Sequence, residues 1–199
     1  MTRNVLVAAG LLLSLPWSLL GQEGPGPYPA PKAEVFGAYS LVHLEGTDMS
    51  GWNFSLAGNL NNNLGIVGEA SGHYNRESST NALGTTSSKL TFHSFLAGPR
   101  ITERRYKWIS PFVHSLFGFT RVNAKLSQSI TGAPTASSQN DVSAFALALG
   151  GGLDITNDPR FFIRLIQADY FLVRADKIKH EGLRISAGLL LRFGRRETF

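Results

Sequence analysis

The sequence lacks cysteine and is poor in charge. None of its 199 residues is cysteine, and only 17% are Asp, Glu, Lys or Arg, against about 25% in ordinary soluble proteins. The absence of cysteine excludes a disulfide scaffold, a zinc site with cysteine ligands and a thiol nucleophile. The net charge of +5 is spread without a basic run, which argues against nucleic acid as a partner. The length fits one domain and excludes a multidomain enzyme.

The first 21 residues form a separate segment. Arg3 precedes a mainly apolar stretch, residues 5–20, which is followed by Gly21. A short positive start, an apolar core and a small residue are typical of a secretory signal peptide, so we expect residues 1–21 to be cleaved. A transmembrane anchor is the alternative, but its apolar core falls short of the roughly 20 residues that a spanning helix needs. Residues 22–33 then form a Pro/Gly-rich lead-in, expected to be extended and periplasmic.

From residue 34 onwards the dominant pattern is alternation of apolar and polar residues. A period of two, interrupted by Gly, Asn, Asp, Ser and Pro clusters, predicts strands separated by turns. Each predicted strand has about ten or more residues, the length that a tilted strand needs to cross a hydrocarbon layer. The eight segments are 34–43, 51–60, 64–74, 88–100, 108–126, 141–155, 160–174 and 182–193.

The two faces of these strands differ in side-chain size. In the second segment, Trp52 and Phe54 share one face, whereas Asn53 and Ser55 share the other. Such small polar residues cannot fill a soluble core, and the bulky face is too continuous to lie in water. We therefore predict an all-β fold over residues 34–193, an eight-stranded antiparallel up-and-down transmembrane β-barrel with its bulky residues toward lipid. Closure is required because an open sheet edge in hydrocarbon leaves backbone groups unsatisfied.

The links between the segments differ at the two ends of the predicted barrel. The links after the odd-numbered segments are together longer than those after the even-numbered ones, and barrels of this kind have long extracellular loops and short periplasmic turns. The N-terminus is therefore expected in the periplasm. The polar, Ser/Thr-rich segments 75–87 and 127–140 are expected to be surface loops, and tight turns are expected at 61–63 (NNN) and 157–159 (NDP).

Two segments have a phase that alternation does not settle. These are 108–126 and 160–174. Pro111 should lie near the periplasmic end or at a bulge, because it donates no ladder hydrogen bond. Placing Arg164 against lipid near mid-depth would cost about 2–4 kcal/mol. We therefore expect a bulge near 164–167, or an Arg164 close to the interface.

Charged and polar residues within the strands are candidates for the lumen or its mouths. Carboxylates and arginines in a narrow barrel usually pair with each other, which compensates their charge and fills the interior. The alternative interpretation is a polar path for small solutes. The candidates are Glu69, His73, Arg121, Asp154, Asp169, Arg184 and Arg192.

The last predicted strand resembles the assembly signal of outer-membrane barrels. Ser186, Gly188, Leu191 and Phe193 match its pattern of a polar residue, a glycine, an apolar residue and an aromatic one. The resemblance implies recognition by the barrel-assembly machinery through these four residues. Many members of the family end on the aromatic residue, whereas a short tail, residues 194–199, follows it here.

Fragments elsewhere carry the same resemblance. With the segments 95–100 (FLAGPR), 111–113 (PFV) and 150–154 (GGGLD), the chain resembles the OmpA-like/OmpX-like eight-stranded outer membrane protein β-barrel domain family. The resemblance implies an integral protein of the Gram-negative outer membrane. We do not expect the peptidoglycan-binding domain of full-length OmpA proteins, because the chain stops shortly after the eighth strand.

Five histidines raise the alternative of a lipid-modifying barrel enzyme, similar to lipid A deacylases. His93-Ser94 and His114-Ser115 are adjacent pairs, but neighbours along a strand point to opposite faces. An active site would therefore need a Ser and a His from neighbouring strands to converge on the lipid face near the outer rim. The histidines show no metal-ligand spacing, and the glycines at 150–152 lack the Lys and the helix of a phosphate-binding loop. We expect no catalytic residue, no cofactor and no metal.

The sequence thus predicts a non-enzymatic outer-membrane protein of a Gram-negative bacterium, acting as an envelope scaffold or a surface interaction protein. Limited porin-like solute passage would fit the same fold. Its expected partners are outer-membrane lipids and lipopolysaccharide, together with an unidentified extracellular partner and no nucleic acid, and we expect a monomer. A secreted, lipocalin-like binder of an apolar ligand is a further alternative, which requires the bulky residues to face inward.

Overall fold

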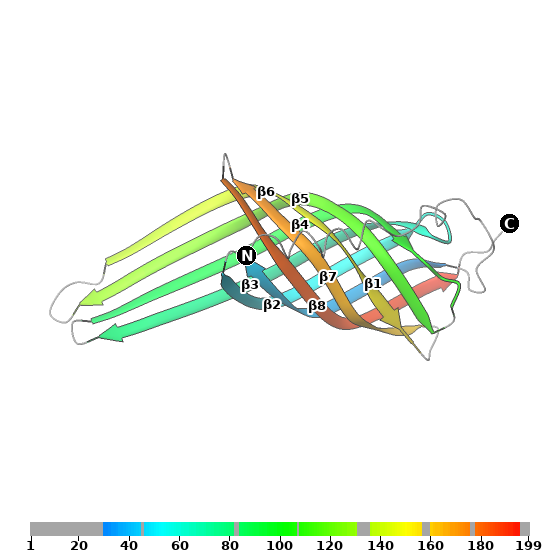
Figure 1. Cartoon of the computed structure of the whole chain (residues 1–199), viewed down its shortest axis with the longest axis horizontal. Helices are drawn as coiled ribbons and strands as arrows, with labels where there is room; N and C mark the ends of the chain where they lie inside the picture. The colour runs from blue at the N-terminus through cyan, green and yellow to red at the C-terminus, as the bar shows by residue number, and fades with distance from the viewer. Residues whose placement is uncertain are drawn as a thin grey trace.

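The protein is a closed antiparallel barrel whose strands follow one another in chain order (Figure 1). The computed structural model describes residues 30–44, 46–81, 84–106, 108–130, 136–156, 160–175 and 178–195. The predicted signal peptide, residues 1–21, lies outside these ranges, as do residues 22–29 of the predicted lead-in and the predicted turn at 157–159. Within them, no helix is long and apolar enough to cross a membrane. The strands are β1 (Pro31–Leu44), β2 (Thr47–Asn59), β3 (Leu64–Asn81), β4 (Gly84–Thr102), β5 (Ile109–Ile130), β6 (Ala136–Ile155), β7 (Phe161–Ala175) and β8 (Ile178–Arg195).

The orientation of the side chains confirms the predicted sidedness. Trp52 and Phe54 are each 42% exposed, whereas their neighbours Asn53 and Ser55 are 1% and 3% exposed. The bulky residues therefore lie on the outside and the small polar ones in the lumen. This arrangement contradicts the lipocalin-like alternative, which needs the bulky face inside.

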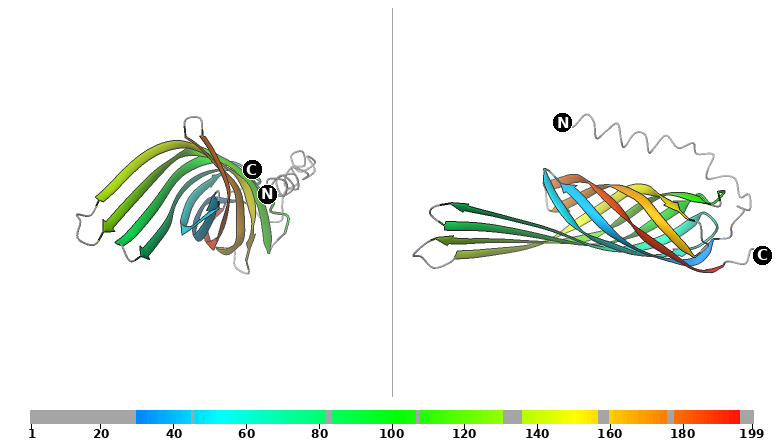
Figure 2. Two further views of the ribbon diagram at one scale, coloured as in Figure 1. Left: turned by 60° about the vertical axis from the view of Figure 1, so that its left-hand side comes forward. Right: turned by 90° about the horizontal axis from the view of Figure 1, so that it is seen from below.

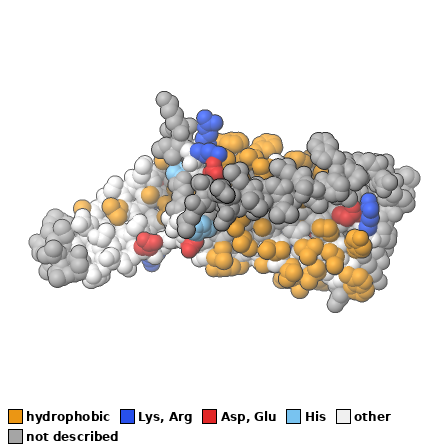
Figure 3. Space-filling view, viewed as in Figure 1, with side chains coloured by type: hydrophobic (Ala, Val, Ile, Leu, Met, Phe, Trp, Pro, Cys, Tyr) orange, Lys and Arg blue, Asp and Glu red, His pale blue; other side chains and the backbone are white. Residues whose placement is uncertain are grey.

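An apolar belt surrounds the barrel. Figure 3 shows hydrophobic side chains gathered over the barrel part of the molecule, while the part that projects from it is mostly covered by other residue types. Exposed members from each of the eight strands include Tyr39, Leu41, Trp52, Phe54, Leu56, Ile66, Phe95, Phe117, Phe119, Phe145, Leu149, Ile163, Leu165, Leu183, Ile185 and Leu189.

The described parts of the two segments predicted as long surface loops, residues 75–81, 84–87, 127–130 and 136–140, are strands instead. β3 and β4 stay paired from Leu64↔Ile101 to Asn81↔Gly84, and β5 and β6 stay paired out to Gln128↔Ala136. Residues 75–81, 84–90, 123–130 and 136–142 form a four-stranded sheet that extends well beyond the barrel (Figure 2). We call it the projecting sheet. The prediction of loops was wrong because backbone pairing continues from the ladder below and does not need apolar side chains.

Both edges of the projecting sheet are open among the described residues. The pairing of β2 with β3 stops at Ser50↔Tyr74, and the pairing of β7 with β6 starts only at Phe145↔Arg174. The other hairpins at this end are much shorter. The β1–β2 connection turns at Gly46, whose φ of 84° lies in the left-handed region that glycine adopts without strain.

The opposite end of the barrel carries the remaining connections and the described ends of the chain, Pro31 and Arg195 (Figure 1). The predicted Asn turn is confirmed: Asn61 Oδ1 accepts hydrogen bonds from the backbone N–H groups of Asn63 and Leu64, at 2.9 and 2.6 Å. Pro111 lies at this end, near the start of β5, as expected.

The register of β7 resolves the irregular seventh segment. Its pairing with β8 shifts between Arg164 and Gln167, and its pairing with β6 shifts between Leu153 and Asp154. The predicted bulge near 164–167 is confirmed. Leu165 and Ile166 both face outward at this bulge, so Arg164 and Gln167 both face the lumen.

The projecting sheet can be tested with engineered disulfides, because the chain has no cysteine of its own. Ser78 and Ser87 are direct partners in β3 and β4, whereas Ser79 pairs with Thr86 and points to the opposite face. Oxidation should cross-link a Ser78→Cys/Ser87→Cys variant, since directly opposed side chains come close to disulfide geometry. Gel mobility with and without reductant measures the cross-link.

The matched control is Ser79→Cys/Ser87→Cys, which is shifted by one residue and should remain mostly reduced. Equal cross-linking of the two variants would mean that residues 75–87 form the mobile loop that the sequence suggests. The cross-linked variant should otherwise behave as the wild type, because both serines lie far from the barrel wall.

Candidate functional site

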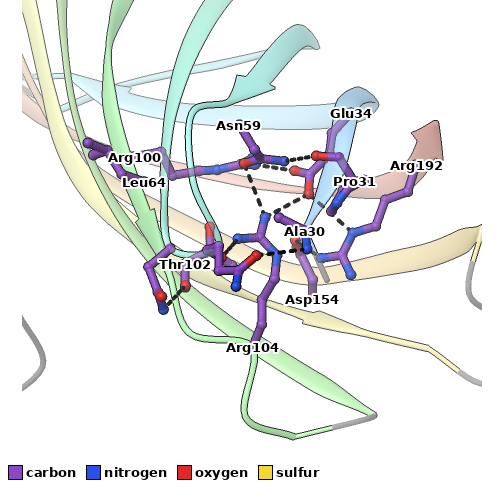
Figure 4. Close-up of polar contacts among 12 residues, drawn as sticks. Ala30, Pro31, Glu34, Asn59, Leu64, Arg100, Thr102, Arg104, Asp154 and Arg192 are labelled. Carbon is purple, nitrogen blue, oxygen red and sulfur yellow. Dashed lines mark hydrogen bonds and ion pairs between the residues drawn. The ribbon is translucent and has the colours of Figure 1, made fainter. Parts of the chain in front are cut away.

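The lumen contains a network of buried charged residues, which begins at the end of the barrel that carries Pro31 and Arg195. Glu34, on β1, is only 1% exposed. It forms an ion pair with Arg100 and lies 3.1 Å from Arg104 Nη2 and 3.2 Å from Arg192 Nε (Figure 4). One carboxylate thus joins three arginines that come from β4, from the β4–β5 connection and from β8.

Arg104 closes this end of the lumen. Its guanidinium donates to the carbonyl of Asn62 at 2.5 Å and to Asn59 Oδ1 at 3.2 Å, while Asn59 Nδ2 donates to the carbonyl of Pro31 at 2.9 Å. Burial lowers the pKa of Arg104, and the neighbouring Glu34 opposes that shift. The side chain therefore ties two turns and the start of β1 together across the mouth.

Arg164 connects this end to the middle of the lumen. It binds Asp154 through Nε and Nη2, at 2.7 and 3.2 Å, and donates to Gln167 Oε1 at 2.8 Å. Its guanidinium also lies 4.1 Å from the ring centroids of both Phe36 and Phe112. Stacking between two aromatic faces stabilises a cation that has left water. The bulge in β7 turns this arginine inward, so it has no contact with lipid.

A second group of charges lies deeper in the barrel. Arg184 Nη1 is 2.6 Å from Glu69 Oε1, and Arg184 Nη2 is 2.7 Å from Asp169 Oδ2. His114 Nε2 is 2.7 Å from Asp169 Oδ1. Each of these side chains is at least nine-tenths buried. Arg184 therefore compensates the charges of Glu69 and Asp169 in a part of the lumen that water does not reach.

Gly150 makes the contact between His114 and Asp169 possible. These two residues lie on β5 and β7 and are both register partners of Gly150 on the intervening β6. A Cβ at Gly150 would collide with the Asp169 carboxylate. The glycine therefore leaves room for the hydrogen bond to pass over β6, because glycine in a strand marks a place where other groups approach closely.

Most of a buried apolar cluster lies above the charged network, on the side of the projecting sheet; only Ala57 and Val67 lie toward the end that carries Pro31 and Arg195. Following each strand in that direction, Val42 comes after Ser40, Phe92 after Ser94, and Phe171 after Asp169. The wall of β6 contributes only alanines to this layer, which makes room for the larger residues. The members of this buried apolar cluster are Val42, Met49, Ala57, Val67, Phe92, Leu96, Leu116, Ala144, Ala146, Ala148, Phe171 and Val173. The lumen is therefore less polar than the sequence analysis predicted.

Most of the predicted lumen residues are inside. Glu69, His73, Asp154, Asp169 and Arg184 are buried, and Arg192 lies at the mouth with 9% of its side chain exposed. All of them except His73, which bonds to Ser40, join one network with residues that alternation did not single out: Glu34, Arg100, Arg104, His114, Arg164 and Gln167. Parity with Phe36 identifies Glu34 as an inward residue, whereas nothing in the sequence marks Arg104, which lies in a connection.

The prediction for Arg121 was wrong. Its neighbour Thr120 is completely buried in the lumen, so Arg121 points outward. The sequence leaves the phase of β5 ambiguous, because bulky residues such as Phe112 and Phe117 occur on both faces of the strand. Arg121 instead lines an external hollow, which is described below.

The described contacts of His43, His73, His93 and His114 do not include the Ser–His pair on the lipid face that the alternative of a lipid-modifying enzyme requires. A serine–histidine contact does occur, with His73 Nε2 lying 2.9 Å from Ser40 Oγ, but both residues are buried in the lumen. His73 Nδ1 has no partner among the described residues, so no carboxylate orients the ring as in a catalytic triad. On the outer face, His93 contacts Tyr74. The described ranges also hold no group of three or more His, Asp or Glu side chains suited to a metal ion.

Removing one partner of the central ion pairs should destabilise the barrel strongly, because it leaves buried charges without compensation. In Arg184→Met, Glu69 and Asp169 lose their shared cation, and removing one partner of a buried ion pair typically costs about 3–5 kcal/mol. We expect the free energy of unfolding, measured by urea titration in lipid vesicles, to fall by that amount. Adding Asp169→Asn to the variant should restore part of it.

The control for this prediction is Lys179→Met, on the same strand. Lys179 is 54% exposed and pairs with Glu181, so its removal should change stability by less than about 1 kcal/mol. If Arg184→Met were as stable as Lys179→Met, the buried network would not be what holds the lumen together.

Comparisons with known proteins place the fold. No protein-family model matches the sequence, and no curated protein matches it. The crystal structure of Ail, the attachment invasion locus protein of Yersinia pestis, matches with a TM-score of 0.52 at 23% identity, covering 82% of this chain and 99% of that one. Ail in complex with the heparin analogue sucrose octasulfate matches with a TM-score of 0.50 at 21% identity, covering 82% and 99%.

The crystal structure of Neisserial surface protein A has a TM-score of 0.53 at 14% identity, and the match covers 81% of this chain and 96% of that one. At such low identity the likeness concerns the fold and not the activity. The closed ring of eight strands, its outward apolar belt and these matches agree: the chain has the fold of the OmpA-like/OmpX-like eight-stranded outer-membrane β-barrels.

Proposed function

We propose that this protein is an integral outer-membrane barrel of a Gram-negative bacterium, and that it acts without catalysis as a scaffold that carries the projecting sheet at the cell surface. The observation on which this rests is the apolar belt around a closed barrel. A belt of this size would be unstable in water, and a closed barrel is one of the two structures that satisfy all backbone groups in lipid. Residues 1–21 would be the signal peptide that directs export.

The filled lumen supports a scaffold more than a pore. Paired charges occupy the middle of the lumen and the end that carries Pro31 and Arg195, and most of the buried apolar cluster lies between them and the projecting sheet. A hydrated solute would have to displace both layers. We therefore propose a sealed barrel, and a lack of conductance in planar bilayers would distinguish it from a narrow channel.

The projecting sheet is the proposed contact surface. Its side chains are mostly Ser, Thr, Asn, Gln and Lys, and most of those described are exposed. Ail is by its name an attachment protein and Neisserial surface protein A a surface protein, and Ail has been solved with a heparin analogue. These names support surface contact as the role of this chain, and we propose that it works as a monomer.

The proposed location can be tested by membrane fractionation and by gel mobility with and without boiling. The protein should appear in the outer-membrane fraction and should migrate differently once heat unfolds the barrel. Protease added to intact cells should cut within the projecting sheet and leave the barrel whole. Recovery in a soluble periplasmic or secreted fraction would overturn the proposal.

The last strand allows a test of assembly. β8 closes the barrel by pairing with β1, with Ser186 and Gly188 turned inward and Leu191 and Phe193 turned outward. We propose that the barrel-assembly machinery recognises these four residues. Phe193→Ser should lower the amount of heat-modifiable protein in the outer membrane several-fold in cells, while refolding of the purified chain in detergent changes little.

Leu189→Ser is the control for that test. Leu189 is 67% exposed on the same face of β8 but lies at a position that the assembly signal leaves open. If both variants lost the same amount of assembled protein, the loss would reflect a weaker contact with lipid and not recognition of the signal.

A further inference from the structure

Cationic side chains line up on the outer face of the projecting sheet. Lys89 on β4 is the direct partner of Arg76 on β3 and of Lys125 on β5. All three are exposed. They share the outward face because the pairing is continuous down to Phe92 and Thr120, which point into the lumen. We call Arg76, Lys89 and Lys125 the basic row.

The basic row is unfavourable for the protein alone. Like charges directly opposite each other on neighbouring strands are destabilising, and this row places three of them side by side. The carboxylate of Asp141, on β6, is the one acidic group on the outward face of the described projecting sheet, and Gln139 donates to it at 3.5 Å. Glu77 follows Arg76 along the strand and therefore points to the other face. The row thus lacks a carboxylate partner among the described residues.

An external hollow lies on the same strands, four residues below the basic row. It has a volume of about 420 Å³ and is lined by His93, Phe95, Phe119, Arg121 and Ser143. The rings of Phe95 and Phe119, with centroids 5.4 Å apart, form its apolar floor. His93 and Arg121 are direct partners in β4 and β5 and form its polar wall, in which Arg121 carries a positive charge. The hollow is therefore apolar toward the belt and positive toward the projecting sheet.

Aromatic residues fix the level of this hollow at the edge of the belt. Trp52 Nε1 donates to Tyr74 OH at 3.3 Å, and Tyr74 OH lies 3.3 Å from His93 Nε2. The ring of Tyr74 meets that of His93 edge to face, with centroids 5.8 Å apart. Trp and Tyr of membrane barrels gather at the boundary between hydrocarbon and headgroups. Phe95 and Phe119 then lie against acyl chains, and Arg121 lies at headgroup level.

We propose that this face binds a phosphorylated glycolipid of the outer leaflet. An acyl chain would cover Phe95 and Phe119, a phosphate would bind Arg121 and His93, and further anionic groups of a large headgroup would reach the basic row. This inference rests on the proposed outer-membrane location and names the lipid that the protein would hold there.

The height of the basic row decides between a glycolipid and an ordinary phospholipid. Lys89 lies four residues along β4 from His93, which lies at the edge of the belt; this is about 13 Å of strand, or about 9 Å of height at a tilt of about 45°. The headgroup layer of an ordinary bilayer is only about 5–7 Å thick on each side. A phospholipid would therefore satisfy Arg121 and leave the basic row unpaired, whereas a headgroup of several charged sugars spans both levels.

The experiment measures lipid binding by the full chain in detergent micelles, through the fluorescence of the tryptophans, which include Trp52 beside the hollow. The probe is deep-rough lipopolysaccharide, compared with the same lipid after removal of its phosphates. Each basic residue near a membrane surface contributes about 1 kcal/mol of binding, or about fivefold in affinity. We expect Arg121→Gln to weaken binding about fivefold, and Arg76→Gln/Lys89→Gln/Lys125→Gln to weaken it on the order of a hundredfold.

Two further variants keep the test independent of folding. Arg105→Gln removes an exposed arginine at the opposite end of the barrel, beside Glu103, and should bind as the wild type does. Lys89→Glu should abolish most binding while stabilising the projecting sheet, because it places opposite charges across β3, β4 and β5. Unchanged affinity in this variant, or equal binding of the dephosphorylated lipid, would overturn the inference.

Heparin serves as a soluble polyanion without acyl chains. If the basic row bound heparin and the three-residue variant lost that binding while keeping its affinity for lipopolysaccharide, the row would serve a sulfated or phosphorylated glycan, and the glycolipid would be wrong. Failure of the lipid test together with recovery of the protein in the outer-membrane fraction would leave the proposed location intact. Recovery in a soluble fraction would remove the basis of both.

Discussion

Closure of the backbone ladder is the constraint on which the rest of this structure depends. β8 pairs with β1 from Pro31↔Arg195 to Leu44↔Gly182, so the sheet has no free edge in the barrel part. A strand within hydrocarbon must find all its backbone partners in protein, and a ring of eight strands leaves a lumen just wide enough for side chains. Alternation then sends every second side chain into that narrow space. The composition of the lumen follows from this geometry.

The charged residues of the lumen differ in the partners with which they pair. Glu34 meets three arginines, whereas Arg184 meets two carboxylates, and Arg164 stands between two aromatic rings with Asp154 and Gln167 at its edge. A buried charge without a partner costs several kcal/mol. The network therefore holds eight strands in one register more than it adds net stability, because a slip by one residue would expose these charges to lipid.

The fold was predictable from the sequence because the alternation of side chains has a physical cause. Trp52, Asn53, Phe54 and Ser55 alternate in size and polarity, and that pattern fixes which face is outside once the lumen is known to be narrow. The bulge in β7 was also predictable, because Arg164 could not face lipid.

Other features depend on contacts across the barrel that no local pattern reveals. Arg104 reaches Glu34 from a connection, and Arg121 lies outside because of the phase of β5. The Ser/Thr-rich segments 75–87 and 127–140 have the composition of loops. Their described residues are nevertheless paired, because the β3–β4 and β5–β6 backbone hydrogen bonds of the barrel continue into them. Composition says which side chains water accepts, and it does not say whether the backbone is paired.

The rim of the barrel is stepped, and this has a consequence for anything that approaches from the side of the projecting sheet. β1–β2 and β7–β8 end in short hairpins while β3 to β6 rise as a wall, whose inner face continues from the lumen with Leu90, Val122 and Val142. A bulky molecule that approaches this end can rest on the short β1–β2 and β7–β8 hairpins and contact the inner face of the wall. From the other side, the wall itself blocks access to the rim of the barrel. The stepped rim therefore favours approach from one side and sets the orientation of a bound molecule about the barrel axis.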